Sequence, residues 1–359
     1  MSHQPLLVNL SALIQKPTGI SVYARNLLPE LKPLNPMVLG NQNFAGIKQL
    51  TIPNNLSPEY GLKGHVKRLW WLQNSLPRIY QELESTLIFS PLPEAPIYRK
   101  CRFITTVHDL IPLRFPRPWS PLTNYFRYVV PLILREAVHI ICDSDSTARD
   151  LEEFYEIKRE KMTTIPLAYD RKTFKFDRGQ TEANYFLYIG RQDTYKNLGR
   201  LVEAFSQICA VTDTQLWFVG PRDQRYTPQL VDQVKHLDIE SRVRFLDYVA
   251  YSELPKLLGG ALTLTFPSLW EGFGLPALEA MACGTPVIAS NLSSLPEVVG
   301  AAAILVDPYN VAELADAMKM VANDAQLRAQ LQVKGLERAK QFTWEKTGQH
   351  TMEVLRRFL

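Results

Sequence analysis

The sequence PSLWEGFGLPALE at residues 267–279 joins a predicted strand to a predicted helix. The apolar run that precedes it, residues 261–266, is typical of a buried strand. Pro276 suits the first turn of a helix, where the missing N–H of proline would have no partner anyway. A strand, a glycine-rich turn and a helix N-terminus together favour phosphate binding, because glycines let the backbone approach a ligand and free N–H groups attract anions.

Two carboxylates lie beside this turn, Glu271 at its start and Glu279 one turn into the predicted helix. Because carboxylates repel phosphate, we expect them to bind another part of the same ligand. An ionised carboxylate only accepts hydrogen bonds, and the hydroxyl groups of a sugar can donate them. The sequence therefore points to a ligand that carries both phosphate and sugar.

Strand-like and helix-like segments alternate along the whole chain, in two series separated by a polar linker in residues 170–184. This alternation predicts an α/β protein of two doubly wound parallel-sheet domains, at residues 1–170 and 171–342. Residues 41–62 are rich in Asn, Gly and Pro and are predicted to form a loop. Ligands bind beyond the C-terminal ends of such strands, so a cleft between the domains is the expected site. The predicted strands are residues 6–10, 87–90, 103–107, 139–142, 162–165, 185–190, 215–220, 243–246, 261–266, 286–290 and 303–306.

Length and composition also indicate two soluble domains. The chain has 359 residues, of which 46% are apolar and 21% charged, and it is too long for one ordinary core. Residues 1–142 carry 15 Lys and Arg against 7 Asp and Glu, a balance of +8, whereas residues 143–359 carry 25 against 29, a balance of −4. A basic N-terminal half attracts anionic substrates or an anionic membrane surface, or it serves solubility alone.

The four cysteines form no CxxC pair and are predicted to be reduced thiols of the core. The N-terminus lacks the long apolar segment of a signal peptide, and no run reaches the ~18 apolar residues that span a bilayer. We therefore expect a cytoplasmic protein, with peripheral association at the inner face of the membrane through the basic N-terminal domain as a further possibility.

Two cations, Arg191 and Lys196, lie where the first strand of the second domain ends and the next helix begins. This places both at the sheet edge that carries the glycine-rich turn. They can neutralise a pyrophosphate and stabilise it as it leaves with its negative charge. Cations at a helix start oppose the helix dipole, so a purely structural role explains them less well.

The first domain offers His108, at the end of a predicted strand, and Gly19, in the turn after the first strand. A histidine in this place can bind a sugar or assist a proton transfer, or it can be structural. Gly19 can let backbone N–H groups approach a phosphate. Trp70 and Trp71, with basic residues nearby, either contact a lipid headgroup or acceptor, or belong to the core with a solvated basic face.

Residues 143–145, Asp-Ser-Asp, have the form of a motif that binds a divalent metal in one class of sugar transferases, but Ser and Asp are also ordinary helix caps, which we favour. No His and Cys cluster has metal-ligand spacing. The first strand is not followed by Gly-x-Gly-x-x-Gly, and no P-loop is present. These absences argue against a nicotinamide dehydrogenase and a P-loop nucleotidase.

Taken together, these residues resemble the retaining glycosyltransferases of family 4, which have the GT-B fold of two facing Rossmann-like domains. The most specific element is Glu-x7-Glu, here Glu271 and Glu279, within EGFGLP. Gly190-Arg191 with Lys196-Asn197 is similar to the diphosphate-binding pair of the family. Phe245 to Val249 is similar to its nucleobase segment, although Asp247 stands where the family often has Gly. Residues 106–112, TVHDLIP, resemble a subgroup that includes mannosyl- and other hexosyltransferases of surface polysaccharides.

The resemblance implies a role for each of these residues. Glu279 would bind the ribose hydroxyls, and Glu271, with the backbone of Gly272, Phe273 and Gly274, would bind the donor sugar. His108 would face that sugar beside its anomeric carbon. The residues implied in binding phosphates and nucleobase are Gly19, Arg191, Lys196, Leu275, Tyr248 and Val249. The final helix, 343–359, would pack back on the first domain.

The resemblance further implies an enzyme that retains anomeric configuration and needs neither metal nor cofactor. We expect transfer of a hexose from a nucleotide sugar to a saccharide or lipid-linked acceptor in surface polysaccharide biosynthesis, with no nucleic acid partner. UDP-glucose or a similar UDP-hexose is the first donor candidate, and GDP-mannose is the second. The alternatives are a UDP-sugar epimerase of the same fold and a non-catalytic nucleotide-sugar binder.

Overall fold

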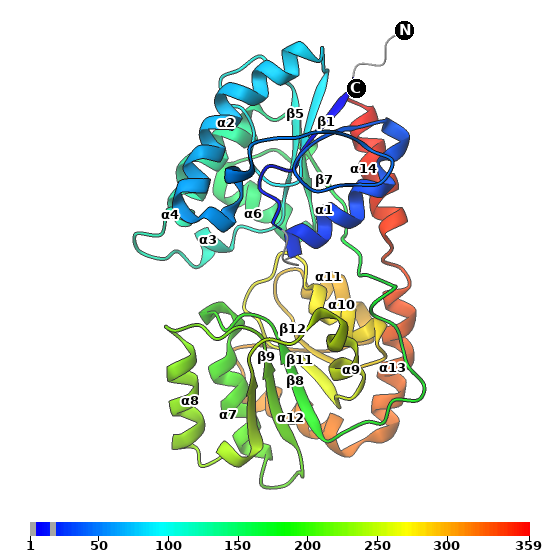
Figure 1. Ribbon diagram of the computed structural model, residues 1–359. Helices are drawn as coiled ribbons and strands as arrows, with labels where there is room; N and C mark the ends of the chain where they lie inside the picture. Colours follow the sequence, from blue (N-terminus) through cyan, green and yellow to red (C-terminus); the bar gives the residue numbers. More distant parts are fainter. Residues whose placement is uncertain (1–4, 15–18) are drawn as a thin grey trace. The chain divides into compact units, whose positions relative to one another are not determined.

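The computed structural model describes residues 5–14 and 19–359 and divides the chain into two compact units (Figure 1). Unit 1 contains the chain up to Leu167 together with Thr343–Leu359, and unit 2 contains Ala168–Phe342. Each unit is built on one parallel sheet flanked by helices. The predicted α/β fold of two parallel-sheet domains is thereby confirmed.

Unit 1 has a seven-stranded sheet in the order β3-β2-β1-β4-β5-β6-β7, with every strand pair parallel. Because β5 and β6 are neighbours, the residues that follow them lie close together at the C-terminal edge. The strands are β1 (Leu6–Asn9), β2 (Met37–Leu39), β3 (Lys48–Leu50), β4 (Leu87–Ser90), β5 (Phe103–Val107), β6 (His139–Cys142) and β7 (Met162–Thr164).

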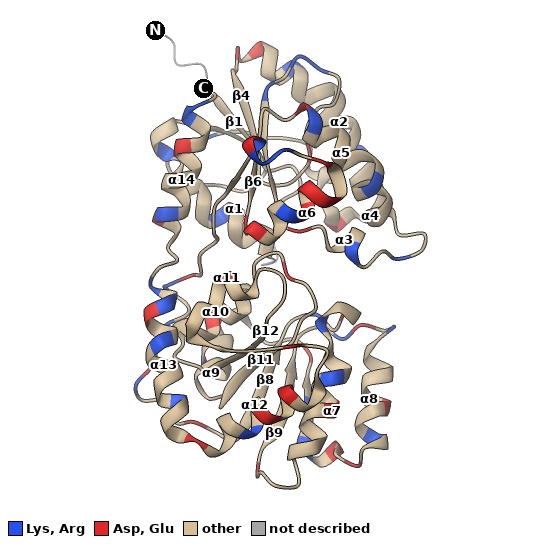
Figure 2. Cartoon of the chain, turned by 180° about the vertical axis from the view of Figure 1, so that it is seen from behind, with Lys and Arg blue, Asp and Glu red and all other residues tan. Residues whose placement is uncertain are grey.

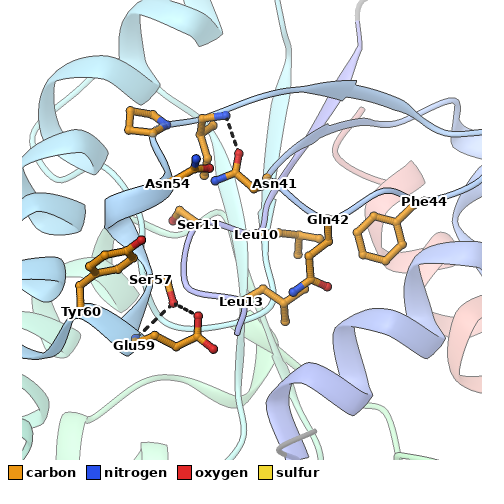
Figure 3. A pocket seen from close by; sticks show the side chains of 13 residues that line it. Leu10, Ser11, Leu13, Asn41, Gln42, Phe44, Asn54, Ser57, Glu59 and Tyr60 are labelled. Atoms are coloured by element: carbon orange, nitrogen blue, oxygen red, sulfur yellow. Dashed lines mark hydrogen bonds between the residues drawn. The ribbon is translucent and has the colours of Figure 1, made fainter. Parts of the chain in front are cut away.

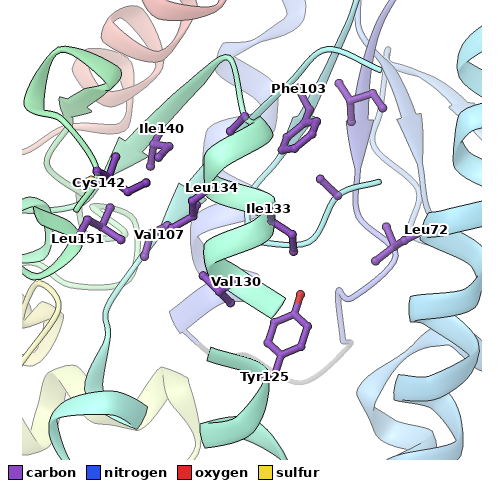
Figure 4. Close-up of a cluster of buried hydrophobic side chains, with 14 of the residues drawn as sticks. Leu72, Phe103, Val107, Tyr125, Val130, Ile133, Leu134, Ile140, Cys142 and Leu151 are labelled. Atoms are coloured by element: carbon purple, nitrogen blue, oxygen red, sulfur yellow. The ribbon is translucent and has the colours of Figure 1, made fainter. Parts of the chain in front are cut away.

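The helices of unit 1 are α1 (Gly19–Glu30), α2 (Gly61–Glu82), α3 (Ile111–Arg114), α4 (Pro121–Asn124), α5 (Val130–Glu136), α6 (Asp145–Tyr155) and α14 (Trp344–Arg356). Shorter helical turns are η1 (Lys32–Leu34), η2 (Asn54–Leu56), η3 (Pro58–Tyr60), η4 (Tyr125–Val129) and η5 (Arg159–Lys161). Apolar side chains from the sheet and from α2, α5 and α6 fill the core between them (Figure 4). This core supports the ends of β5 and β6.

The last helix, α14, belongs to unit 1 and packs against α1. Thr347 Oγ1 donates to the Pro166 carbonyl at 2.8 Å, which ties the helix to the end of the first chain segment. Gly348 lets the two helices approach, since a Cβ at this position would lie 2.2 Å from Glu30 Cβ. The chain therefore returns to unit 1 after completing unit 2.

Unit 2 has a six-stranded parallel sheet in the order β10-β9-β8-β11-β12-β13. The order reverses between the central strands β8 and β11, so the loops after these two strands meet at the C-terminal edge. The strands are β8 (Tyr185–Ile189), β9 (Gln215–Val219), β10 (Val243–Leu246), β11 (Thr263–Phe266), β12 (Val287–Ser290) and β13 (Ile304–Val306). The helices are α7 (Leu198–Ile208), α8 (Thr227–His236), α9 (Leu254–Gly259), α10 (Leu275–Ala282), α11 (Leu295–Val299), α12 (Val311–Asn323) and α13 (Ala325–Ala339), with turns η6 (Thr194–Lys196), η7 (Glu240–Arg242), η8 (Tyr251–Glu253) and η9 (Gly300–Ala302).

All the predicted strands are present, but residues 41–62 are not only loop. They contain β3 and the turns η2 and η3. All four cysteines are free. Cys142 and Cys283 are buried as predicted for core thiols, whereas Cys101 and Cys209 are only partly buried. Within the described residues, we find no helix with the length and apolar character needed to cross a membrane.

Candidate active site

The glycine-rich turn between β11 and α10 requires glycine at its last position. Gly274, directly before α10, has a φ of 103°. A Cβ on Gly274 would lie 2.6 Å from Leu295 Cδ2, so neither the backbone conformation nor the space suits a side chain. The first turn of α10, which begins at Leu275, contains no acidic residue. Its dipole therefore favours an anion at this end.

Two serines from the loop after β12 fix the shape of this turn. The Glu271 N–H donates to Ser293 Oγ at 2.9 Å. Ser294 Oγ lies 3.0 Å from the Glu271 carbonyl oxygen and 2.9 Å from that of Phe273. Sequence reasoning missed these serines. Their position just after β12, the predicted strand that pairs with β11, could have indicated that they lie near the turn.

The structure brings Lys196 and Glu271 into direct contact. Lys196 Nζ lies 2.5 Å from Glu271 Oε1, and both side chains are about 90% buried, with 11% and 10% of their surface exposed. Lys196 Nζ also lies 4.9 Å from the Tyr195 ring centroid and 5.3 Å from that of Phe266, so aromatic faces add to its stabilisation. The lysine balances the charge of a carboxylate that lies beside an anion-favouring turn.

The loops that carry this pair are held together by backbone contacts. The Leu269 N–H donates to the Tyr195 carbonyl at 2.7 Å. Asn197, whose φ is 61°, directs its Nδ2 to the carbonyl oxygens of Pro267 and Pro308, at 3.2 Å and 2.6 Å. The separation of Lys196 and Glu271 is therefore set by the fold rather than by the two side chains alone.

Arg191 follows β8 and remains accessible. Its side chain is 65% exposed, and its Nε lies 3.2 Å from Asp193 Oδ2, on a side chain that is only 5% exposed. The buried Tyr188 hydroxyl donates to the Arg191 carbonyl at 2.7 Å and holds the backbone. Arg191 can thus reach an anion at the sheet edge, while Asp193 limits where its guanidinium lies.

Glu279 lies one turn into α10 and is only partly exposed. Burial, followed by the nearby charge of Asp170, raises the pKa of Glu279 to about 8. Asp170 is held in place, because its carboxylate accepts from the Lys172 N–H at 3.0 Å and from Thr173 Oγ1 at 2.6 Å. The carboxyl group of Glu279 is therefore mainly protonated at neutral pH in the absence of a ligand, and Asp170 is a neighbour that the sequence did not reveal.

The predicted nucleobase segment, Phe245 to Val249, covers the end of β10 and the loop after it, two strands from β8 in the sheet. Tyr248 is 81% exposed, and Val249 is half-buried. Asp247 is exposed and pairs with Arg222, whose Nε lies 2.5 Å from Asp247 Oδ1. Because all strands are parallel, this loop lies at the same sheet edge as Arg191 and the glycine-rich turn.

His108 belongs to unit 1, and each of its two ring nitrogens faces a hydrogen-bond acceptor. Its Nδ1 lies 2.6 Å from Asp143 Oδ2, and its Nε2 lies 2.9 Å from the Pro91 carbonyl oxygen. A carboxylate and a carbonyl both accept, so this arrangement requires a proton on each ring nitrogen. Burial alone lowers the pKa of His108, but Asp143, the Pro91 carbonyl and the Asp109 charge together raise it above its ordinary value. The imidazolium is the favoured form.

The three residues 143–145 contact different partners. Asp143 is 2% exposed and pairs with His108, and no described residue pairs with its Oδ1. Ser144 is the N-cap of α6 and accepts from the Thr147 N–H at 3.0 Å, which confirms the capping prediction. Asp145 contacts Arg159 and Thr164 instead. In residues 5–14 and 19–359, no group of three or more His, Cys, Asp or Glu side chains has a metal-binding arrangement.

Gly19 is the first residue of α1, and a Cβ at this position would have nothing within 4 Å. Of the turn predicted at residues 16–20, residues 16–18 lie outside the described residues, and Gly19 and Ile20 belong to α1 instead. Gly19 and His108 are in unit 1, whereas Arg191, Lys196, Tyr248, Val249, Glu279 and residues 271–275 are in unit 2. The roles assigned to all these residues stay predictions.

Unit 1 also contains a polar hollow of about 300 Å³ beyond the C-terminal ends of β1 and β2. Figure 3 shows Ser11 within it, with Glu59 and Tyr60 on one side and Gln42 and Phe44 on the other. Ser11 Oγ is buried, and no described residue bonds to it. A hollow in unit 2, of about 420 Å³, lies beside residues 192–200 and is not lined by Lys196 or Glu271.

Protein-family profiles match both parts of the chain. The profile described as Glycosyl transferases group 1 matches residues 170–338, and the profile described as Glycosyltransferase Family 4 matches residues 17–172. O-antigen chain mannosyltransferase B of Escherichia coli is 30% identical over 272 residues, which are 72% of this chain and 71% of that protein. O-antigen chain mannosyltransferase RfbU of Salmonella typhimurium (strain LT2) is 25% identical over 327 residues, covering 88% and 90%.

Solved structures share the fold over nearly the whole chain. Sucrose-phosphate synthase from Thermosynechococcus elongatus has a TM-score of 0.78 at 20% identity and covers 99% of this chain and 98% of that one. Anabaena Alr3699/HepE in complex with UDP and glucose has a TM-score of 0.75 at 20% identity and covers 99% and 100%. These similarities establish the GT-B fold.

Proposed function

Because the chain belongs to glycosyltransferase family 4, we propose that it transfers a hexose from a nucleoside diphosphate sugar to a saccharide or lipid-linked acceptor, with retention of anomeric configuration. The observation that carries this proposal is the buried contact of Lys196 with Glu271, directly before a glycine-rich turn that favours anions. This arrangement offers a cation for the diphosphate and a carboxylate for the sugar hydroxyls.

In the proposed reaction, the bond between the anomeric carbon and the diphosphate oxygen breaks, and the acceptor oxygen bonds to the same face of that carbon. The acceptor proton passes to the leaving diphosphate, so no protein base is needed. Arg191 and Lys196 compensate the negative charge that develops on the leaving group. His108, held as an imidazolium with both ring N–H groups already engaged, is assigned to the donor sugar as a positively charged group rather than as a base or a hydrogen-bond donor.

For the donor we place GDP-mannose first and UDP-glucose second, which reverses the order expected from the sequence. The two relatives described above are mannosyltransferases by name, at 30% and 25% identity, whereas the UDP-bound neighbour shares only 20% identity. Asp247 adds a chemical reason. Guanine presents two adjacent N–H donors that match a carboxylate, whereas uracil presents one N–H between two carbonyl oxygens.

For the acceptor we propose the polar hollow of unit 1. Hydroxyl, amide and carboxylate groups of Ser11, Asn41 and Glu59 suit sugar hydroxyls, and Tyr60 offers an aromatic face. The unpaired Ser11 Oγ gives the most specific support, because a buried polar group without a partner is costly unless a ligand or water satisfies it. A lipid-linked acceptor would also bring unit 1 to a membrane surface.

We further propose that the reaction requires no metal or cofactor, since Arg191 and Lys196 supply the positive charge that a metal otherwise provides. Transfer should therefore persist in excess chelator. Loss of transfer on chelation, with recovery on adding a divalent cation, would contradict this part of the proposal.

The decisive experiment compares thermal unfolding with GDP, UDP, GDP-mannose and UDP-glucose, because a ligand of the native state raises the melting temperature by mass action. We expect GDP and GDP-mannose to stabilise most, and Asp247→Ala to reduce the preference for GDP over UDP. Stabilisation by UDP ligands alone would restore UDP-glucose as the donor. Turnover of a UDP-sugar to a different free sugar without any acceptor would support the epimerase instead.

A further inference from the structure

Residues 91–96, Pro-Leu-Pro-Glu-Ala-Pro, follow β4 and form a largely buried segment that we call the proline loop. In the sheet, β4 lies between β1 and β5. The proline loop therefore lies between His108, which follows β5, and the polar hollow beyond β1 and β2, which we call the acceptor hollow. Proline has no N–H group, so the carbonyl oxygens are the groups of this buried loop that most need partners.

Five successive carbonyl oxygens of the proline loop accept hydrogen bonds from side chains elsewhere in unit 1. For residues 91–95 in order, the donors are His108 Nε2, Thr105 Oγ1, the Tyr125 hydroxyl, Asn9 Nδ2 and Gln73 Nε2, at 2.9, 2.5, 2.8, 3.4 and 3.1 Å. These donors come from β1, α2, β5, η4 and the residue just after β5. The position of the loop is thus fixed from several directions, and the loop contacts His108 directly.

The side chain of Glu94, within the proline loop, forms a buried ion pair with Arg68 on α2. Arg68 Nε lies 2.8 Å from Glu94 Oε2, and Nη2 lies 2.9 Å from Oε1, which is the bidentate geometry of a guanidinium on a carboxylate. Arg68 is 3% exposed and Glu94 6%. Figure 2 marks the cations along α2 in blue, and the others, Lys63, Lys67 and Arg78, are exposed.

Contacts of Arg68 and Glu94 reach two segments of the acceptor hollow. Arg68 Nη1 donates to the Leu56 carbonyl at 2.8 Å, and Leu56 belongs to η2, whose first residue lines the hollow (Figure 3). Asn9, which donates to the Glu94 carbonyl, accepts from the Ser11 N–H through its Oδ1 at 3.2 Å. The same ion pair is therefore connected to the acceptor hollow and, through the proline loop, to His108.

A buried ion pair contributes little net stability, because the desolvation of both charges offsets their attraction. The pair instead gives a fixed orientation to the segments it contacts. We propose that Arg68 and Glu94 are positioning residues, which hold the acceptor hollow and His108 at a fixed separation through the proline loop. An acceptor bound in the hollow then presents its hydroxyl group at a constant distance from His108. This inference rests on the proposed function, which assigns the hollow to the acceptor.

The first test compares NMR spectra of the unmodified chain and Arg68→Met/Glu94→Gln without substrate. Replacing both members leaves no isolated buried charge, so the variant should fold. The pKa of His108 should fall, because the Pro91 carbonyl helps to raise it. The Ser11 amide signal should move as well, because its hydrogen bond depends on the same loop. Arg68→Lys keeps the charge but loses the bidentate contact, so it should change both signals in the same direction, and it decides the test if the double variant does not fold.

The second test measures steady-state transfer from whichever of GDP-mannose and UDP-glucose stabilises the chain more, with p-nitrophenyl α-mannoside as the acceptor probe. Arg68→Met/Glu94→Gln should raise the KM for the acceptor about tenfold and lower kcat about 100-fold, because a displacement of about 1 Å is enough for such a loss. The KM for the donor should change by less than about twofold, since the variant leaves Lys196 and Glu271 in place. A general loss of stability would not separate the two KM values in this way.

Arg328→Met/Glu182→Gln in unit 2 is the matched control. This pair is also bidentate, at 3.0 Å and 2.8 Å, and Arg328 Nη1 likewise donates to a backbone carbonyl, that of Val321, at 2.7 Å. The control should leave the His108 and Ser11 signals and the transfer kinetics unchanged.

Unchanged NMR signals in the Arg68 variants, or equal changes in the control, would overturn the inference. Failure of the inference and failure of the proposed function are separable. Normal kinetics of Arg68→Met/Glu94→Gln would reject the positioning role alone. Absence of transfer by the unmodified chain would count against the proposed function alone, and the NMR comparison would still decide whether the pair positions His108 and the hollow.

Discussion

Both units place an oppositely charged pair at the C-terminal ends of neighbouring strands. In unit 1, His108 and Asp143 follow β5 and β6, and in unit 2, Lys196 and Glu271 lie in the loops after β8 and β11. The contacts are similar in length, 2.6 Å and 2.5 Å. The same sheet geometry therefore produces two pairs, and their chemistry distinguishes them.

The unit 1 pair is closed, because an acceptor occupies each ring nitrogen of His108. The unit 2 pair is open, because an ammonium has three N–H groups and the contact with Glu271 uses one of them. Both carboxylates keep a second oxygen, and that of Asp143 has no partner among the described residues, so the cations distinguish the two pairs. A closed pair fixes the orientation of a ring, whereas an open pair can exchange contacts with a ligand. This difference predicts that changes to the two pairs affect different properties of the protein.

The largest effect is expected from removing both charges of the open pair. Lys196→Met/Glu271→Gln should lower the transfer rate by about 10³-fold, since the leaving group and the donor sugar both lose a partner. The free energy of unfolding should change little, because replacing both members of a buried pair leaves no isolated charge. Steady-state kinetics and urea unfolding measure the two quantities.

The matched control removes an exposed pair of charges from α12 in the same unit. Asp316→Asn/Lys319→Met should leave both the rate and the stability near those of the unmodified chain. A transfer rate of the Lys196→Met/Glu271→Gln variant within a few-fold of normal would show that the open pair takes no part in transfer.

For the closed pair, Asp143→Asn should cost about 3 kcal/mol of stability, since it leaves the buried His108 without its counter-charge. It should also lower the pKa of His108, which Asp143 helps to raise. Urea unfolding and NMR titration of the ring check these outcomes. Asp145→Asn, two residues away with a half-exposed side chain, is the control and should cost less than about 1 kcal/mol. Equal losses of stability in Asp143→Asn and Asp145→Asn would refute the closed-pair interpretation.

The sequence predicted the open pair more fully than the closed one. Strand and glycine patterns located the loops after β8 and β11, and motif resemblance selected Arg191, Lys196 and Glu271. The contact of His108 with Asp143 depends on strand order, which places β5 beside β6, and a residue list does not reveal that order. Segments 37–39 and 48–50 were missed as strands, although β7 and β13, which also have three residues each, were predicted, so length alone does not explain the difference.

The support for the glycine-rich turn gives a smaller expected effect. Gly274→Ala should cost about 2 kcal/mol of stability, because Gly274 has a φ of 103° and its new methyl group would meet Leu295. Gly19→Ala is the control, since nothing lies within 4 Å of its new Cβ, and it should change stability by less than about 0.5 kcal/mol. Thermal or urea unfolding distinguishes the two variants. An unchanged free energy of unfolding for Gly274→Ala would mean that the turn can accommodate a side chain.

The last effect depends on pH and concerns Glu279, which belongs to neither pair. Glu279 is protonated, whereas Glu271 is paired with a cation. The native state keeps the Glu279 proton up to about pH 8, whereas the unfolded chain releases it near the ordinary pKa of 4.5. The native state therefore holds more protons between these values, so the free energy of unfolding falls as pH rises through that window. Glu279→Gln should flatten this fall by about 1 kcal/mol per pH unit. Urea unfolding from pH 5 to pH 8 measures the slope, and parallel curves for the two proteins would mean that burial and Asp170 do not hold the proton on Glu279.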